Sequence, residues 1–427
     1  MTLVKTGMLN GVAVVIRILT SITLNKILAI YVGPSGYAVI GQFQNLVTML
    51  TTFANGATNT GVTKGTAEHF DDPERQVRLW RTAGMITIGG SVSVGLILTL
   101  FNRQLASAFL HETQFSTVFI WLGISLVFVA LNGLLLAILN GKKKIKLFVV
   151  ISIAGSLIGL AMTGGLTILF GLTGALVALS VNQAIVFFVT TAACLRQPWF
   201  RFSMLVGSID GSALRELLKF TAIALTSATL GPLTQLAIRD HLVGAFGLSG
   251  AGYWDALTRI SGLYLTVVTV PLSIYYLPRL AEIRDLGELR REILAGYRII
   301  VPVTVAGALV MYLLRDLMIS ILFTPDFLPM RDLFAWQMIG DVLKISGWLL
   351  GYILIARGMM KAFIVTELLF SLGWYALVWL FSGQYGLEGA QIAYAFNYLL
   401  YIVALSFVLT LLLKNSPGHE NSSPRGI

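Results

Sequence analysis

A duplication that spans about half the chain is the feature that most constrains its fold. Residues 171–182 read GLTGALVALSVN and residues 386–397 read GLEGAQIAYAFN, with six of the twelve positions identical. A second pair of related segments, GPSG at residues 33–36 and GLSG at residues 247–250, has nearly the same separation. In a chain of 427 residues, this pattern predicts one structural unit of about 210 residues that occurs twice.

Hydrophobic residues make up 56% of the chain and charged residues only 12%. The apolar runs repeatedly reach the roughly 20 residues that an α-helix needs to cross a bilayer, which predicts an all-α polytopic membrane protein without a soluble domain. About twelve spans are expected, near residues 9–32, 37–62, 82–102, 115–139, 147–170, 173–195, 217–243, 250–277, 297–322, 332–356, 361–382 and 386–413.

Division of these spans between two copies gives about six helices in each half, and an even number leaves both halves with the same orientation. This arrangement predicts a pseudo-twofold axis along the membrane normal, with a substrate path between the halves. We therefore assign residues 1–195 to the N-terminal half, 196–218 to a cytoplasmic linker, 219–414 to the C-terminal half and 415–427 to a disordered cytoplasmic tail.

Lys and Arg residues fall mainly in alternate loops, and the positive-inside rule uses this asymmetry to orient the chain. One set of loops holds most of the 30 basic residues, whereas the opposite loops hold only Arg103, Arg239, Arg315 and Arg331. Both termini are therefore expected in the cytoplasm. Because the basic residues are spread over short loops rather than gathered on one face, no nucleic-acid partner is expected.

The single cysteine, Cys194, excludes a disulfide within the chain and any cluster of cysteine metal ligands. The four histidines lie outside the expected spans or at their ends, without metal-ligand spacing, and are expected to be solvated loop residues. We therefore expect neither a metal nor a cofactor. These histidines are His69, His111, His241 and His419.

A polar stripe follows one face of the second expected span. Its members recur every three or four residues, which is the period of one helix face, and such a face is expected to meet water or protein rather than lipid. The eighth span, which is its repeat, carries a similar stripe. Hydrogen-bonded packing between helices is the alternative, mainly for Thr and Ser. The expected cavity residues are Gln42, Asn45, Thr52, Asn55, Asn59 and Asp255, with Asn10 on the first span.

Charged residues inside the spans are the strongest functional signal, because an Arg, Lys or Asp at the bilayer centre costs about 2.5 to 3.5 kcal/mol. Asp255 with Arg259, and Asp341 with Lys344, are spaced as local ion pairs. Each pair is therefore either functional or a neutralised structural bridge. Lys26 lies nearer the outer end of its span, where its side chain can reach the interface.

Arg17 lies deep in the first span without an acid in its own helix. The uncompensated arginine favours an anionic substrate, because guanidinium groups match phosphate oxygens and stay charged. We expect Arg17 and Arg259, with Lys344, to contact a phosphate or pyrophosphate.

A further stripe in the tenth span offers hydrogen bonds and an aromatic face suited to a sugar. It consists of Gln337, Asp341, Lys344 and Trp348. Three acids within spans are separate candidates for ion coupling: Asp255, Asp341 and Glu367.

The turn YVGPSGY at residues 31–37, the Asn-rich second span and the GLxGA entries at residues 171 and 386 resemble those of the Wzx polysaccharide flippases of the MOP superfamily. The resemblance covers essentially the whole chain. It implies a MOP/MATE-like fold with a V-shaped central cavity in the bacterial inner membrane. It also implies alternating-access movement of an undecaprenyl-pyrophosphate-linked oligosaccharide, in particular lipid III of enterobacterial common antigen synthesis, from the cytoplasmic to the periplasmic leaflet. A polymerase and a chain-length regulator of the same pathway are partners implied by the resemblance alone.

Other functions fit the residues less well. A multidrug exporter of the same superfamily is the main alternative, but such exporters handle organic cations with buried carboxylates, whereas the first span carries Arg17 and Lys26. An enzyme of the same pathway is expected to have a sizeable outer loop with acids and bases, and no loop of that kind is present between the expected spans. We therefore expect a transporter rather than an enzyme.

Overall fold

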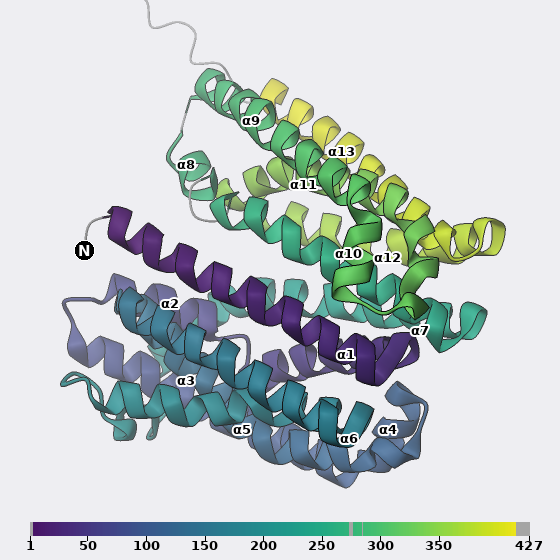
Figure 1. The fold of residues 1–427 in the computed structure, drawn as a ribbon. Coiled ribbons are helices and arrows are strands. Elements are labelled where there is room, and N and C mark those ends of the chain that lie inside the picture. Colours follow the sequence, from purple (N-terminus) through teal and green to yellow (C-terminus); the bar gives the residue numbers. More distant parts are fainter. Residues whose placement is uncertain (1–2, 273–275, 284, 416–427) are drawn as a thin grey trace, which may run out of the picture. The chain divides into compact units, whose positions relative to one another are not determined.

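The computed structural model describes residues 3–272, 276–283 and 285–415, and these residues are helical apart from short turns and loops (Figure 1). The side chains of several residues within helices, including residues 3–10, lie outside this description. The expected tail at 415–427 also lies outside it, apart from Asn415.

The helices follow one another in an order that occurs twice along the chain. The first series is α1 (Leu3–Ala54), α2 (Asn59–Glu68), α3 (Pro73–Leu100), α4 (Asn102–Leu110), η1 (Thr113–Phe115), α5 (Ser116–Gly141) and α6 (Ile145–Leu195). After η2 (Phe202–Leu205) the second series is α7 (Gly211–Pro271), α8 (Leu277–Glu282), α9 (Leu286–Leu313), α10 (Arg315–Leu322), η4 (Pro325–Leu333), α11 (Phe334–Ala356), α12 (Met360–Tyr385) and α13 (Glu388–Asn415). The two helices α12 and α13 together correspond to α6.

Eight helices in the described part of the chain are long and apolar enough to cross a membrane, judged by length and composition. Two of these candidate spans, Ala13–Ala54 and Ile145–Leu195, contain 42 and 51 residues, whereas about 20 residues of helix cross a bilayer. Each is interrupted by a glycine with non-helical backbone angles, so each contains two of the expected runs. The multi-pass helical fold is confirmed, and the count of about twelve spans stays a prediction.

Four glycines break the long helices, and they form two repeat-related pairs. Gly33 in α1 and Gly247 in α7 have φ angles of 66° and 72°. Gly171 in α6 and Gly386 after α12 have φ angles of 57° and 64°. Glycine adopts these positive-φ, extended-ψ conformations readily, whereas other residues pay a steric penalty. The repeat in the sequence therefore coincides with a repeat in backbone conformation.

The described helices form two compact units. Unit 1 comprises Met1–Ala256 and Asp316–Arg331, and unit 2 comprises Leu257–Arg315 and Asp332–Ile427. Each unit has an apolar core of its own. The first is built largely from α3, α5 and α6, and the second largely from α11 and from buried residues between Leu272 and Leu289, with α13. The division expected from the repeat, with boundaries at residues 195 and 219, stays a prediction.

The segment between α6 and α7, expected as a linker over residues 196–218, packs against α3 and ends in the first turns of α7. Leu205 is fully buried, and its carbonyl group approaches Gly84 so closely that a Cβ there would overlap it. The backbone nitrogen of Asp210 donates a hydrogen bond of 3.0 Å to Oγ1 of Thr82. The segment is therefore bound along the start of α3.

A lysine between α5 and α6 joins this segment to two other parts of unit 1. Nζ of Lys142 lies 5.3 Å from the ring of Phe70, 5.6 Å from that of Trp80 and 5.5 Å from that of Trp199. Burial, with a smaller contribution from the charge of Lys144, lowers the pKa of Lys142. Cation–π attraction thus links the α5–α6 loop to α3 and to the segment that follows α6.

The close approach at Gly84 generates a stability prediction. Gly84→Ala should destabilise the protein by about 1–3 kcal/mol, because the new methyl group must displace the backbone of residue 205. The measurement is the thermal unfolding midpoint of the purified protein in detergent. Gly89→Ala is the matched control on the same helix, since nothing lies within 4 Å of a Cβ there. An equal loss in both variants would contradict the proposed cause.

Candidate functional site

A buried ion pair braces the two arms of α7 on either side of Gly247. Arg239 and Asp255 are 2% and 4% exposed, and Nη2 of Arg239 donates to Oδ1 of Asp255. Nη1 of Arg239 donates a hydrogen bond of 3.2 Å to Oε1 of Gln42 in α1. The guanidinium carbon also lies 5.4 Å from the ring of Trp254. The pair therefore fixes the α7 hairpin and contacts α1 through a neutral amide.

The repeat-related position in α1 has the same bracing role with different chemistry. Asn25, which corresponds to Arg239 in the repeat, is buried. Its backbone carbonyl accepts a hydrogen bond of 2.7 Å from the hydroxyl of Tyr37, across the break at Gly33. Each hairpin is thus closed near its turn by a contact between its own two arms.

Arg239, near the end of the expected span 217–243, was counted with an outer loop. This assignment was wrong, because the residue lies in the buried interior of unit 1. The sequence suggested Arg259 as the partner of Asp255 at i,i+4. The structure also pairs Asp255 with Arg239, which the sequence analysis did not expect. One signal in the sequence could have found it: the repeat aligns Arg239 with Asn25, which lies well inside the first expected span.

The polar stripe expected on the second span divides at the end of α1. Nδ2 of Asn45 donates a hydrogen bond of 3.1 Å to Oε1 of Gln235 in α7, whereas the hydroxyl of Thr52 bonds back to its own helix. The expected span at 37–62 was too long, because α1 ends at Ala54. Asn55 accepts a hydrogen bond from the backbone of the following turn, and Asn59 begins α2.

The two basic residues expected in the first span have different surroundings. Arg17 is exposed on α1, and no acid in the described part of the chain pairs with it. The side chain of Lys26 was expected to reach the membrane interface. In the structure its Nζ donates hydrogen bonds to the carbonyl oxygens of Ser320 and Phe323 at the end of α10. The side chain of Asn10 lies outside the described residues.

In unit 2, Asp341 is the centre of a buried hydrogen-bond network. Its side chain is 0% exposed, and Oδ2 accepts bonds from the hydroxyls of Ser261 at 2.7 Å and Tyr264 at 2.9 Å. Oδ1 accepts from the hydroxyl of Tyr394 at 2.9 Å and from Nε2 of Gln337 at 3.0 Å. These donors come from α7, α11 and α13. The carboxylate therefore joins three helices through neutral hydrogen-bond donors, which satisfy its oxygens without an ion pair among the described residues.

Lys344 lies one turn from Asp341 but does not form the local ion pair that was expected. Its Nζ lies 5.1 Å from the ring of Trp348, and 5.8 Å from each of the rings of Tyr394 and Tyr398. No carboxylate among the described residues lies within ion-pair distance of it. The ammonium group is thus held by ring faces, a setting in which cation–π attraction replaces a counter-ion.

Two further expected residues lie in unit 2. Arg259 is half-buried on α7 and Glu367 is half-buried on α12. Arg17 belongs to unit 1, whereas Arg259, Lys344 and Glu367 belong to unit 2. No group of three or more His, Cys, Asp or Glu side chains in the described part of the chain is arranged to hold a metal ion.

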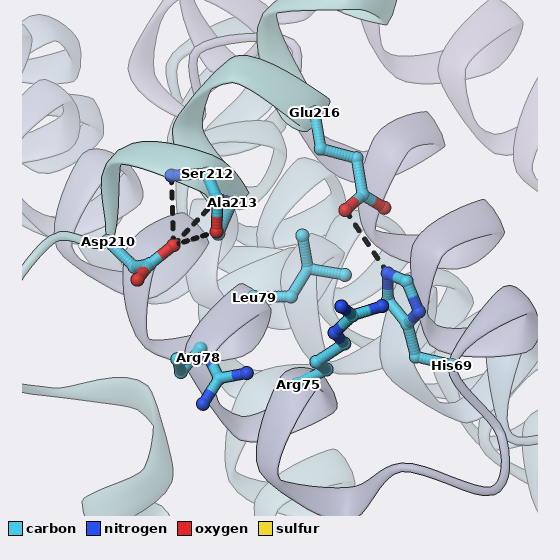
Figure 2. A pocket seen from close by; sticks show the side chains of 8 residues that line it. All are labelled: His69, Arg75, Arg78, Leu79, Asp210, Ser212, Ala213 and Glu216. Atoms are coloured by element: carbon cyan, nitrogen blue, oxygen red, sulfur yellow. Dashed lines mark hydrogen bonds and ion pairs between the residues drawn. The ribbon is translucent and has the colours of Figure 1, made fainter.

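A cavity of about 240 Å³ lies in unit 1 between α3 and the start of α7 (Figure 2). Figure 2 shows His69 directed at Glu216, with Nε2 of the histidine 3.2 Å from the carboxylate. Asp210 caps α7 by accepting from the backbone nitrogens of Ser212 and Ala213. The pKa of Asp210 is lowered mainly by the hydrogen bond from the Ser212 hydroxyl, and next by the bond from the Ala213 backbone. Both acids are therefore already engaged in contacts within the chain. The contact between His69 and Glu216 links the end of α2 to α7 beside the cavity.

Solved structures with this fold are transporters of the MOP superfamily. A multidrug resistance MATE family transporter in an inward-facing conformation has a TM-score of 0.76 at 14% identity, covering 94% of this chain and 96% of that chain. The lipid II flippase MurJ in an inward closed conformation has a TM-score of 0.69 at 14% identity, covering 95% and 87%. At these identities the likeness shows the fold alone.

Comparison of sequences goes further. A family described as polysaccharide biosynthesis protein matches residues 27–332. The lipid III flippases of Escherichia coli K12 and Shigella flexneri are each 29% identical over 402 residues, 94% of this chain and 96% of those proteins. The chain therefore belongs to the polysaccharide biosynthesis protein family. The resemblance noted in the sequence is confirmed.

The buried pair in unit 1 generates a second stability prediction. Arg239→Ala should destabilise the protein by about 3–5 kcal/mol, because it removes the cation that pairs with the buried Asp255 carboxylate. Thermal unfolding in detergent measures the change. Arg331→Ala is the control, since its pair with Asp316 is about half exposed and should contribute less than about 1 kcal/mol. Similar losses of stability in both variants would show that the buried Arg239 pair stabilises the protein no more than an exposed pair does.

Proposed function

We propose that this protein is a flippase for lipid-linked oligosaccharide, and that its substrate is lipid III, the undecaprenyl-pyrophosphate-linked repeat unit of the enterobacterial common antigen. The observation that carries the proposal is the similarity to lipid III flippases along nearly the whole chain, at 29% identity over 94% of its length. The proposed direction is from the cytoplasmic to the periplasmic leaflet of the inner membrane. Membership in a polysaccharide biosynthesis family supports the class of substrate.

The proposed architecture has about twelve spans in two halves related by a pseudo-twofold axis, with a V-shaped central cavity and both termini in the cytoplasm. The matching glycine conformations at Gly33 and Gly247 support this arrangement. So does the contact between the repeat-related hydroxyls of Ser35 and Ser249, which lie 3.0 Å apart. Two equivalent residues that touch are expected on the axis that relates their halves.

The proposed pyrophosphate contacts are Arg17, Arg259 and Lys344. Arg17 supports this role because it is exposed on a helix where charge is costly and has no acid partner among the described residues. Lys344 supports it because ring faces rather than a carboxylate hold its ammonium group, which leaves its charge available to an anion. Guanidinium and ammonium groups together suit the phosphate oxygens of the head group.

The proposed sugar contacts combine amides with aromatic faces. In unit 2 the relevant groups are Gln337, Asp341 and Trp348, with the ring of Tyr398 beside Lys344. In unit 1 the proposed polar wall consists of Asn10, Gln42, Asn45, Thr52, Asn55 and Asn59. Gln42 and Asn45 already form hydrogen bonds to α7. A sugar that binds them must therefore replace these hydrogen bonds with bonds from its own hydroxyl groups.

The proposed driving force has two candidate sources. If the cell interior is negative, each negative charge that leaves gains about 2.3 kcal/mol per 100 mV, which favours export of a pyrophosphate. Ion coupling through Asp255, Asp341 or Glu367 is the second source. Asp255 suits this role least, because its protonation requires the loss of the Arg239 pair. Glu367 suits it better, since it is half-buried on α12.

The test of this function is the flipping of an undecaprenyl-pyrophosphate oligosaccharide in proteoliposomes. Arg17→Ala, Arg259→Ala and Lys344→Ala should each reduce the initial rate about tenfold or more, the size expected for loss of one charge-assisted hydrogen bond. Lys361→Ala, an exposed lysine on α12, is the control and should flip at the wild-type rate. A wild-type protein that is inert toward this lipid but exports organic cations would establish the exporter alternative.

Ion coupling makes a separate prediction with the same assay. If Asp341 or Glu367 carries a coupled ion, Asp341→Asn and Glu367→Gln should remove the dependence of flipping on an imposed proton or sodium gradient. Both substitutions replace a carboxylate by an amide of nearly the same shape, so the side chain can no longer bind a proton or a cation through its charge. A wild-type rate that is indifferent to both gradients, and unchanged in both variants, would leave the membrane potential as the driving force.

A further inference from the structure

Two charged side chains at repeat-related positions each bind the short helix of the opposite helix series. Lys26 in α1 and Asp240 in α7 have the separation of Ser35 and Ser249, which is 214 residues. Lys26 contacts the end of α10, and Asp240 contacts the end of α4. The helices α4 and α10 also correspond in the repeat, since each follows a 28-residue helix, α3 or α9. The exchange is therefore reciprocal.

The two contacts differ in chemistry: Lys26 meets carbonyl groups at a helix end, whereas the carboxylate of Asp240 meets an imidazole ring. Nζ of Lys26 donates a hydrogen bond of 3.0 Å to the carbonyl oxygen of Ser320, and a second to that of Phe323. The last carbonyl groups of a helix lack helical partners and carry partial negative charge, so a cation is favourable there. On the other side, His111 caps α4 with a φ of 57°, and its Nε2 lies 3.2 Å from Oδ1 of Asp240.

Between these two contacts the repeat-related turns touch. The hydroxyl oxygens of Ser35 and Ser249 lie 3.0 Å apart. The carbonyl group of Pro34 lies where a Cβ on residue 252 would be, so only glycine at that position permits the approach. All of these residues belong to unit 1. Backbone of one turn thus rests directly on backbone of the other.

We propose that these contacts form an outer latch, which holds the periplasmic side shut while the cytoplasmic side is open. We define the latch as Lys26 on the end of α10, Asp240 on His111, and Ser35 on Ser249. The proposal rests on the proposed function, since it assigns a gate to an alternating-access transporter whose Gly33 and Gly247 turns face the periplasm.

The chemistry of the latch is that of a reversible contact. The side chains of His111 and Asp240 are 47% and 60% exposed, and a polar contact so open to water stabilises little, so it breaks at small cost. The Lys26 contact is stronger because it is partly buried and makes two hydrogen bonds. Beneath it, the ring of Tyr37 packs 5.7 Å from that of Phe323, which positions the acceptor carbonyl.

The experiment measures how fast a disulfide forms across the turns. Ser35→Cys and Ser249→Cys are combined in a Cys194→Ser background, which removes the native thiol, and the protein in lipid vesicles is oxidised with copper phenanthroline. The parent should cross-link rapidly. Lys26→Met should slow the reaction about fivefold, as expected for loss of a cation at a helix end, and Asp240→Asn about twofold.

The controls separate the latch from general loosening. Lys26→Arg keeps a donor and a positive charge, so it should restore the parent rate. Lys361→Met and Asp332→Asn, both exposed in the structure, should leave the rate unchanged. If Lys26→Met lowers the unfolding temperature while the cross-linking rate stays the same, Lys26 is a static brace and the latch is refuted. Asp240→Asn and Lys26→Arg keep the test decisive if Lys26→Met does not fold.

Transport measured on the same samples keeps the latch and the function distinct. The cross-linked parent should not flip lipid, and a reductant should restore flipping. If cross-linking depends on Lys26 but the reduced protein flips no lipid-linked oligosaccharide, the latch stands and the proposed substrate fails. If the oxidised protein flips at the full rate, the turns do not need to part and the latch is refuted.

Discussion

The bilayer interior supplies no hydrogen-bond partners, so each polar group within the spans must be satisfied by another part of the protein. The two clusters described above meet this constraint in different ways. Arg239 and Asp255 neutralise one another, whereas Asp341 receives its hydrogen bonds from hydroxyl and amide donors on three helices. The first solution fixes a hairpin through charge. The second leaves a carboxylate with no cation at ion-pair distance among the described residues.

Much of the fold was predictable because it depends on local patterns. Apolar length indicates helices that cross a membrane, and the repeat of GPSG and GLSG indicates where long helices break. The end of α1 was missed, although Asn55 followed by Gly56 is a turn signal. The positive φ angles of Gly56 and Ala57 end the helix there. Polar periodicity continued to Asn59 and concealed this boundary, because period alone does not detect a break between two polar residues.

The partners of charged residues were predicted less well, because pairing depends on tertiary contacts. Sequence spacing matched Asp341 with Lys344, which lie within one turn of the same helix. In the structure the hydroxyls of Ser261 and Tyr394, which lie on other helices, donate hydrogen bonds to the Asp341 carboxylate instead. Local spacing identifies the neighbours that are possible, and the packing of distant segments decides between them. The repeat is the one sequence signal that carries tertiary information here, since it relates Arg239 to Asn25.

The strength of the contacts differs within and between the hairpins of unit 1. Within α7 the arms are joined by a buried ion pair, and within α1 by the Tyr37 hydroxyl and the carbonyl of Asn25. Between α1 and α7 the described polar contacts include single hydrogen bonds to uncharged amides. Gln42 accepts one from the Arg239 guanidinium, and Asn45 donates one to Gln235.

Removal of one partner of a buried ion pair costs about 3–5 kcal/mol, whereas a typical hydrogen bond contributes about 0.5–1.5 kcal/mol. The α7 hairpin is therefore expected to move as a rigid body, because its own arms are joined more strongly than it is joined to α1. A protein that must open a path for a large polar head group needs this order of strengths. The repeat places a contact between the two arms at both equivalent positions, Asn25 and Arg239, and the contact in α7 is the stronger one.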